Sequence, residues 1–477
     1  MLRVQQIDFY RLQMTTRFPF RYGIATLSEL PHLVVRAEVE IDEHRTIGMS
    51  ADGLAPKWFT KDPTTDYASQ DLPQMLRSIQ VAARLATQLP VQRDFFHWWQ
   101  AFQHDLHGWA TVESIPPLLA SFAGSLIERT VLEAFCRRHE TPLSKALRQN
   151  IFKFDLGQIR PDLSGIRPRD VLPDRPLSSV VVRHTVGISD PFTEGEIDSN
   201  ERIDDGLPHS LVAAIERYGL THMKVKLSGD ARNNRDRMIE LAKLLKQQIG
   251  SELRFSLDAN EQFSSMDEFR EQWLLLQSEP LLCDLFTNAL LFVEQPVHRE
   301  QALSDSTGDS LDRWPDHPPM IIDESDAELE SLPRALQIGY SGTSHKNCKG
   351  IVKSLLAAAT IQRNKDSALP RILSAEDLAN VGPIALHQDL AVVAALGISH
   401  VERNGHHYFA GLKAFSPEVQ QQVLRDHPDL YGWSTHGFAH VIPRDGRLSL
   451  ASINAAPLGV ARPIDLQEFE HWDLSAF

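Results

Sequence analysis

Short apolar runs that contain or precede a charged residue recur through the middle of the chain. Five of these runs are His222–Leu227, Leu253–Leu257, Ala289–Val293, Met320–Ile322 and Tyr340–His345. The charged residues that lie in them or directly follow them are, in order, Lys224 and Lys226, Asp258, Glu294, Asp323, and Lys346. The intervals are close to the ~30 residues that a parallel strand, its crossover helix and the return loop occupy. The pattern predicts an α/β fold with a (β/α)8-type barrel, whose strand ends gather these side chains.

The periodicity also divides the chain into four segments, which are 1–150, 151–179, 180–404 and 405–477. The first begins with strand-like alternation at Leu33–Ile41 and becomes helical, with apolar residues three and four apart across Leu118–Phe135. The second is rich in Pro, Asp and Arg, as is typical of an insertion or linker. The third holds the barrel, beginning with a strand at Val180–His184. Helices are expected at Arg232–Gln248, Met266–Gln277, Leu329–Ile338, Ile351–Gln362, Pro383–Leu396 and Pro417–Arg425.

The composition is that of a globular enzyme. The chain has 477 residues, of which 42% are hydrophobic and 23% are charged, so it exceeds one barrel of about 250 residues. A formal charge of −15 disfavours nucleic acid and anionic membranes as partners. The sequence indicates neither a signal peptide nor a membrane span. Three distant cysteines, Cys136, Cys283 and Cys348, are typical of reduced thiols, so a cytoplasmic location is expected. A homo-oligomer is compatible with the sequence, which does not fix the oligomeric state.

The charged set indicates a particular chemistry. Asp258, Glu294 and Asp323 would form a hard oxygen site suited to Mg²⁺. The ion would face a substrate carboxylate and stabilise the negative charge that grows on it. A lysine near a cation and shielded from water has a lowered pKa and can act as a base. The set therefore predicts removal of a proton alpha to a carboxylate, through an enediolate.

At these residues the chain resembles the enolase superfamily, and within it the muconate-lactonizing-enzyme-like subgroup of the mandelate racemase/muconate lactonizing enzyme family. The matching stretches are Met223–Lys226, Asp258–Asn260, Val293–Pro296, Asp323–Ser325 and Lys346–Gly350. The resemblance implies a modified (β/α)7β barrel, similar to a TIM barrel, with an α+β capping domain formed by residues 1–150 and by the returning segment 405–477.

The resemblance also implies a role for each residue. Lys226 and Lys346 would be the acid/base pair on opposite faces of the substrate. Lys224 would lower the pKa of Lys226 and hold the substrate carboxylate. Asp258, Glu294 and Asp323 would be the metal ligands, and their neighbours Asn260, Gln295 and Glu324 would orient them or begin helices. Lys349 is interpreted as solvent-facing or as a helix start, and Arg183 as part of a surface loop.

Departures from the family pattern narrow the reaction. Racemase-type members carry a histidine on the seventh strand, but this chain has Leu373–Asp377 there, which argues against that mechanism and against many acid-sugar dehydratases. Dipeptide epimerases commonly carry Asp-x-Asp on the eighth strand, where this chain has Glu402–Asn404. Epimerisation, cycloisomerisation and beta-elimination, as in succinylbenzoate synthesis, all remain open. The alternatives are an acid-sugar dehydratase and a barrel that has lost catalysis and serves as a binding or structural protein.

Substrate choice in this family comes from two capping loops that close over the barrel. The matching places are Phe18–Gly23, which includes Phe20 and Tyr22, and Ser50–Ala55, which includes Asp52. Three carboxylates, three lysines and one divalent ion give the expected mouth a net positive charge. The sequence therefore predicts a small carboxylate substrate held under these loops.

Overall fold

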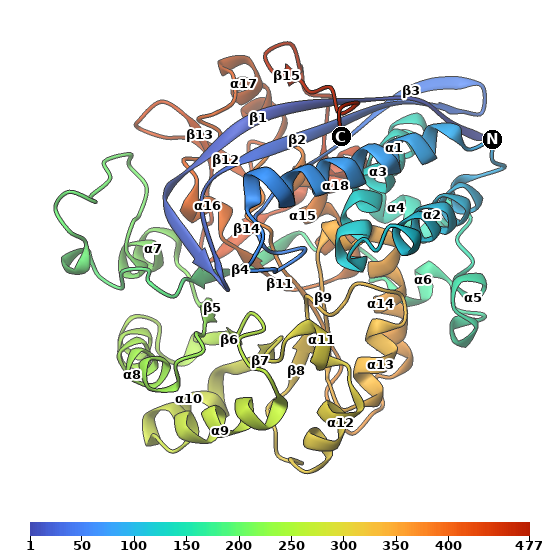
Figure 1. Ribbon diagram of the computed structural model, residues 1–477. Coiled ribbons are helices and arrows are strands. Elements are labelled where there is room, and N and C mark those ends of the chain that lie inside the picture. The colour runs from blue at the N-terminus through green and yellow to red at the C-terminus, as the bar shows by residue number, and fades with distance from the viewer.

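The computed structural model describes residues 1–477, and it combines a capping sheet with a barrel (Figure 1). The capping sheet is antiparallel in the order β15-β1-β2-β3, and its strands are β1 (Leu2–Tyr22), β2 (Ala25–Ile41), β3 (His44–Gly53) and β15 (Glu470–His471). The strand expected at Leu33–Ile41 is the second half of β2, whose first half pairs with the end of β1. The sheet therefore extends further than its most regular alternation indicates.

One face of the capping sheet is covered by helices. The capping helices are α1 (Leu72–Gln88), α2 (Phe95–Val112), α3 (Pro117–Arg138) and α4 (Leu143–Gln149). Every residue of α3 from Ala123 to Cys136 is buried, as expected for a helix that is packed on all sides. It approaches β3 so closely that a Cβ on Gly48 would lie 2.0 Å from the Thr130 carbonyl oxygen. Only glycine therefore fits at this contact.

Eight parallel strands form the barrel. In chain order they are β4 (Ser179–Val186), β5 (His222–Lys226), β6 (Arg254–Asp258), β7 (Leu290–Glu294), β8 (Met320–Ile322), β9 (Gly342–His345), β10 (Ile372–Ala375) and β11 (His400–Arg403). Each pairs with the next from β4 to β10, and β11 pairs with β4. No backbone ladder joins β10 to β11. The predicted barrel is thus present, with one seam that side chains must close.

Helices lie outside the barrel and connect its strands. They are α7 (Leu211–Tyr218), α8 (Ala231–Gln248), α9 (Met266–Gln277), α10 (Pro280–Ala289), α11 (Arg299–Ala302), α12 (Asp305–Asp312), α13 (Ser331–Gln337), α14 (Ile351–Arg363), α15 (Ala385–Leu396) and α16 (Gly405–Tyr408). The expected helices that begin at Arg232 and Met266 correspond to α8 and α9. None of the helices in the chain is both long and apolar enough to cross a membrane.

The segment 151–179 is folded, although its sequence resembles a linker. It contains α5 (Leu156–Ile159) and α6 (Pro168–Val171), of which α6 lies against the barrel helix α14 (Figure 1). Arg160 donates a hydrogen bond of 2.9 Å to Thr360 of α14, and Leu163 is fully buried. Because short helices and irregular turns have no periodicity, the sequence pattern did not indicate this packing.

The C-terminal segment serves both parts of the molecule. It contains α17 (Pro417–Asp426), β12 (Tyr431–Trp433), β13 (Ala439–Val441), β14 (Arg447–Ser449) and α18 (Ala451–Ala455) before β15. Strand β14 pairs with β4 of the barrel, whereas β15 pairs with β1 of the capping sheet. The expectation that this segment completes the capping domain therefore covers only its end.

Arg17 ties the capping sheet to the barrel. It lies near the end of β1, and only 2% of its side chain is exposed. Its guanidinium pairs with Asp205 and donates to the carbonyl oxygens of Leu207, Pro208 and His407, at distances of 2.5–3.0 Å. The planar donor fork of arginine suits such a set of acceptors. The end of β1 is thereby held above the barrel.

We expect Arg17→Met to lower the free energy of unfolding by about 3–5 kcal/mol, because the mostly shielded carboxylate of Asp205, 13% exposed, would lose its partner. Urea denaturation of the purified protein measures this change. Arg17→Lys keeps the charge without the fork, so an intermediate loss is expected from the same measurement. A loss below about 1 kcal/mol for Arg17→Met, as is usual for exposed pairs, would contradict the anchoring role.

Candidate active site

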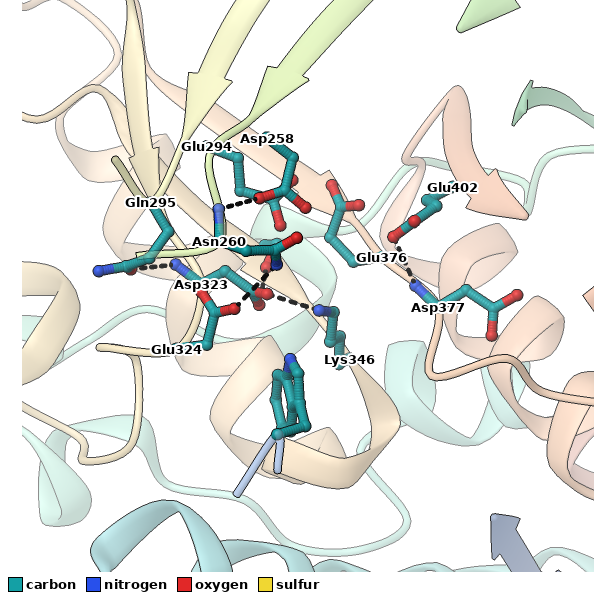
Figure 2. A network of polar contacts seen from close by, with 12 residues as sticks. Asp258, Asn260, Glu294, Gln295, Asp323, Glu324, Lys346, Glu376, Asp377 and Glu402 are labelled. Atoms are coloured by element: carbon teal, nitrogen blue, oxygen red, sulfur yellow. Dashed lines mark hydrogen bonds and ion pairs between the residues drawn. The ribbon is translucent and has the colours of Figure 1, made fainter. Parts of the chain in front are cut away.

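The strand register brings the expected charged residues to one end of the barrel. Lys226 of β5 lies beside Asp258 of β6, which lies beside Glu294 of β7. Asp323 directly follows β8, and Lys346 directly follows β9. Because side chains alternate along a strand, residues two apart such as Lys224 and Lys226 both point into the barrel. Figure 2 shows the three carboxylates and Lys346 gathered around one space.

Lys224 lies at the centre of this arrangement, with 1% of its side chain exposed. Its ammonium is within 2.7–3.0 Å of carboxylate oxygens from four residues, Asp258, Glu294, Glu376 and Glu402. Burial alone would lower the pKa of Lys224, but the four carboxylates raise it well above its usual value. An ammonium has three N–H groups, and hydrogen bonds to the three glutamates use them all. In this arrangement Lys224 has no free N–H group for a substrate carboxylate, and its expected contact with substrate stays a prediction.

The other lysines each pair with an expected metal ligand. The ammonium of Lys226 lies 2.5 Å from a carboxylate oxygen of Asp258. At the other end of the site, the ammonium of Lys346 lies 2.5 Å from a carboxylate oxygen of Asp323. Lys349 bonds Asp323 at 2.7 Å and is buried, so its interpretation as solvent-facing is wrong. Its place in a tight turn after β9 directs it back into the barrel.

For Lys224, Lys346 and Asp323, the summed charges of their partners outweigh the effect of burial on the pKa. Burial would lower the pKa of Lys346, but Asp323 raises it well above the usual lysine range. Conversely, burial would raise the pKa of Asp323, and Lys346 and Lys349 hold it well below its usual value. The expected lowering of a lysine pKa depends on a bound cation beside the lysine, so it stays a prediction. Burial and the nearby Asp258 and Glu376 raise the pKa of Glu294.

Asp258, Glu294 and Asp323 are suited in kind to hold Mg²⁺, but no group of three carboxylate, imidazole or thiol side chains surrounds one point as metal ligands do. The physical reason is that each of the three carboxylates is drawn toward a lysine. Glu294 Oε2 lies 2.8 Å from Lys224 Nζ and yet accepts no hydrogen bond of good geometry. Three hard oxygen donors on neighbouring strands, one with an open acceptor, fit a divalent ion once the ammonium groups of Lys226 and Lys346 have moved.

Three charged groups of the barrel were missed from the sequence. Glu376 follows β10 and Glu402 lies on β11, and Lys224 joins them across the seam that has no backbone ladder. Arg183 of β4 is fully buried and pairs with Glu376, so its assignment to a surface loop is wrong. The charged groups named so far are five carboxylates, four lysines and one arginine. Without a metal ion, the formal charges of this set sum to zero, whereas a net positive charge was expected at the mouth.

Gln295 and Asn260, which follow the expected metal ligands in the chain, form hydrogen bonds that hold the ends of neighbouring strands together. Gln295 accepts hydrogen bonds from the backbone of Asp323 at 2.8 Å and of Ser325 at 3.3 Å. Asn260 donates its backbone N–H to Asp258 at 2.8 Å and its amide to Glu324 at 3.2 Å. Burial and the nearby acidic groups raise the pKa of Glu324 to about 7. These contacts orient the ligand loops, as Figure 2 shows.

The capping domain closes the mouth. A cavity of about 30 Å³ lies between the domains, room for roughly one water molecule. Phe20, Tyr22 and Trp58 line it from the cap, and Lys226 and Lys346 line it from the barrel. The first expected loop thus reaches the site. In the second, Ala55 reaches the cavity.

Asp52 belongs to the interior of the cap and not to the cavity. Its carboxylate pairs with Arg129 of α3 at 2.5 Å, and 1% of its side chain is exposed. Burial raises the pKa of Asp52 to about 6, against the opposing charge of Arg129. Its assignment as a substrate-loop residue is not what the structure shows.

Comparison with solved structures identifies the fold. A dipeptide epimerase from Enterococcus faecalis V583, complexed with Mg and the dipeptide L-Leu-L-Tyr, matches 96% of this chain and 99% of its own at a TM-score of 0.59 and 14% identity. An enolase from Bradyrhizobium, complexed with magnesium and mandelic acid, matches at a TM-score of 0.57 and 12% identity, and the match covers 96% of each chain. The N-succinyl Arg/Lys racemase from Bacillus cereus ATCC 14579 gives 0.57 and 13%, covering 94% of this chain and 97% of that one. No family model and no curated protein matches the sequence.

The chain therefore has the fold of the enolase superfamily, a barrel joined to a capping domain. The same architecture occurs in the solved mandelate racemase/muconate lactonizing proteins from Herpetosiphon aurantiacus and Bordetella bronchiseptica RB50. At 14% identity to each, the likeness concerns the fold.

Asp377 lines the cavity, and its pKa can be used to test how strongly burial destabilises a charged carboxylate there. Burial raises its pKa to about 6, although Arg403 opposes the shift. A carboxyl group whose pKa is raised on folding stabilises the protein below its unfolded pKa, and that stabilisation is lost as pH rises through the folded value. Asp377→Asn remains neutral at every pH. We therefore expect its free energy of unfolding, compared with that of the unaltered protein, to rise by about 2–4 kcal/mol when the pH is raised from about 4 to about 7.

Chemical denaturation at both pH values, with chelator present, measures the difference. Asp174→Asn is the matched control, because the side chain of Asp174 is almost fully exposed. A difference between Asp377→Asn and the unaltered protein that stays constant with pH would contradict the assignment.

Proposed function

We propose that this chain is a Mg²⁺-dependent enzyme that removes the proton alpha to a substrate carboxylate, with Lys226 and Lys346 as the acid/base pair. The observation that carries the proposal is that both lysines line one cavity between the cap and the barrel. They come from the ends of β5 and β9, which lie on opposite sides of an eight-stranded ring. A substrate between them would present one face of its alpha carbon to each. This geometry suits epimerisation or racemisation, in which one lysine takes the proton and the other returns it.

Asp258, Glu294 and Asp323 are the residues that would hold the ion. When bound, Mg²⁺ supplies positive charge beside the substrate carboxylate, where negative charge grows as the proton leaves. Lys226 and Lys346 must first leave their aspartate partners, and the lysine that acts as the base must also release a proton to solvent, because an ammonium has no lone pair with which to accept one. Phe20, Tyr22 and Trp58 exclude water from the closed cavity, which strengthens each electrostatic contact inside it.

The solved structures support this class of reaction. Two of the proteins named above are an epimerase and a racemase, and two are complexed with magnesium. Beta-elimination begins with the same proton removal, and so does cycloisomerisation in its ring-opening direction; each needs only one basic lysine. If one lysine removes the proton and the other only stabilises charge, without returning a proton, the reaction would end in one of those outcomes.

One observation favours a second candidate, a barrel that binds a ligand without catalysis. All four lysines at the site are paired with carboxylates, and the cavity holds little more than a water molecule. If those pairs persisted in solution with Mg²⁺ present, neither lysine could act as a base. Alpha-proton exchange distinguishes the two candidates directly.

The base assignment predicts a face-specific loss of exchange. In D₂O with Mg²⁺, we expect acid sugars, dipeptides, N-acyl amino acids and muconates to include at least one substrate that exchanges its alpha proton. Lys226→Ala and Lys346→Ala should each abolish exchange from one enantiomer while the other still exchanges, and turnover should fall by about 10²–10⁴-fold. NMR measures both. Lys243→Ala, on the exposed side of α8, is the control. Full activity in both site variants would refute the assignment.

The carboxylate requirement gives a further prediction. Replacing the carboxylate of an active substrate by its primary amide should lower kcat/KM by at least about 10²-fold, because the amide carries less of the charge that the metal stabilises. Steady-state kinetics with matched acid and amide measures the ratio. Equal turnover of the two would show that the site does not act on carboxylates.

A further inference from the structure

The cap places an aromatic ring directly on one of the two proposed bases. The ring of Trp58 lies over Lys346, with Nζ 4.6 Å from the ring centroid. Both side chains are buried and line the cavity at the barrel mouth. A cation over an indole face is held by the electrostatic field of the ring, most strongly where water is excluded. The Lys346 ammonium is therefore bound from two directions, by the Asp323 carboxylate and by the Trp58 ring.

A lysine side chain needs such a contact to stay in one place. Its four-carbon stem has many rotamers, and a base must lie within hydrogen-bond reach of the proton it removes. Asp323 alone cannot keep Lys346 in position during the reaction, because Asp323 is also an expected metal ligand and bonds Lys349. Trp58 contributes no charge that would compete for either group. Its ring can hold the side chain when the carboxylate is otherwise engaged.

The Trp58 segment is itself fixed to the barrel by an ion-pair network. Arg299 of α11 donates to the carbonyl oxygens of Trp58 at 2.9 Å and Phe59 at 3.0 Å. Glu261 holds the same guanidinium at 2.8 Å and also pairs with Lys61, at 2.9 Å. The segment thus bonds the barrel through the main chain of Trp58 and Phe59 and through the side chain of Lys61.

Packing within the cap completes the support. Phe59 stacks on Phe122 of α3 with ring centroids 4.2 Å apart, and Trp58 contacts Phe59 edge to face. Tyr22 donates a hydrogen bond of 2.9 Å to the Pro56 carbonyl oxygen. The indole is therefore held on the cap side by aromatic packing and on the barrel side by Arg299. Few other ring positions are open to it.

We propose that Trp58 is a positioning residue that holds the Lys346 side chain at the cavity, and that Arg299 fixes Trp58 through its main-chain carbonyl. Lys226 has no such ring, so the two proposed bases are held differently. Lys226 depends on Asp258, whereas Lys346 depends on both the cap and the barrel. The kinetic consequence rests on the proposed function, but the positioning itself does not.

Chemical labelling tests the positioning without any substrate. Pulses of acetic anhydride under native conditions, followed by mass spectrometry of peptides, give the acetylation rate of each lysine. We expect Trp58→Leu to raise the rate at Lys346 by about threefold to thirtyfold, the range that corresponds to a buried cation–π contact. Trp58→Phe keeps an aromatic face and should stay within about twofold of the unaltered protein. Arg299→Met should act like Trp58→Leu, and it remains as a test if Trp58→Leu does not fold.

Two other lysines serve as internal references in the same spectra. Lys224 is almost fully buried, so its labelling reports unfolding of the whole protein. Lys226 lines the same cavity, so its labelling reports simple opening of the cap. The proposal expects a rise at Lys346 alone. An unchanged rate at Lys346 in both Trp58→Leu and Arg299→Met, or an equal rise at Lys226 and Lys346, would overturn it.

Kinetics with a substrate found in the exchange screen provide the second readout. Trp58→Leu should lower kcat for the face served by Lys346 and leave KM within about twofold, since the ground-state contacts are retained. Trp58→Phe should restore most of the rate. Absence of any active substrate would count against the proposed function, while the labelling result would still decide the role of Trp58.

Discussion

The barrel interior depends on one ammonium group that is buried among carboxylates. Lys224 touches four of them, and no backbone ladder closes the seam at which two of these, Glu376 and Glu402, lie. Removing one partner from a buried charge network leaves an uncompensated charge, which is far costlier than the loss of a surface pair. The lysine therefore does two things that a metal ion does elsewhere: it neutralises the acidic residues and it holds neighbouring strands together.

The same requirement for charge balance connects the site to the cap. Lys346 pairs with Asp323 below it and lies under the ring of Trp58, and the Trp58 segment depends on Arg299 and Glu261 of the barrel. Lys61 of the cap also pairs with Glu261, so charged groups of both domains are paired around a cavity with little free volume. A substrate anion and a divalent ion carry opposite charges, so the two can bind together with little change in the net charge of the site.

Much of this arrangement could be predicted from the sequence because it repeats. Asp258, Glu294 and Asp323 could be assigned to successive strand ends, since a βα unit has a regular length and each ligand follows an apolar run. The same rule, applied to the seventh and eighth strands, would have found Glu376 and Glu402, which follow or lie in short runs of the same kind.

Other features have no signal in the sequence pattern. Lys349 reaches Asp323 because of a tight turn, and Asp52 faces Arg129 because α3 packs closely on β3 at Gly48. Both depend on tertiary packing between segments far apart in the chain. The helices of 151–179 are short and irregular, so their order comes from contacts with α14 and not from periodicity. The resting ion pairs of Lys226 and Lys346 likewise follow from geometry that residue types alone do not determine.

The most direct test of the account is a crystal structure of the protein grown with Mn²⁺, with anomalous scattering used to locate the ion. The account predicts one ion bonded to Asp258, Glu294 and Asp323 at about 2.0–2.3 Å, with the ammonium groups of Lys226 and Lys346 moved off the aspartates and facing each other across the cavity. Lys224 should keep its contacts with Glu376 and Glu402. An ion bound elsewhere, or none at millimolar Mn²⁺ with all the lysine–carboxylate pairs intact, would contradict it.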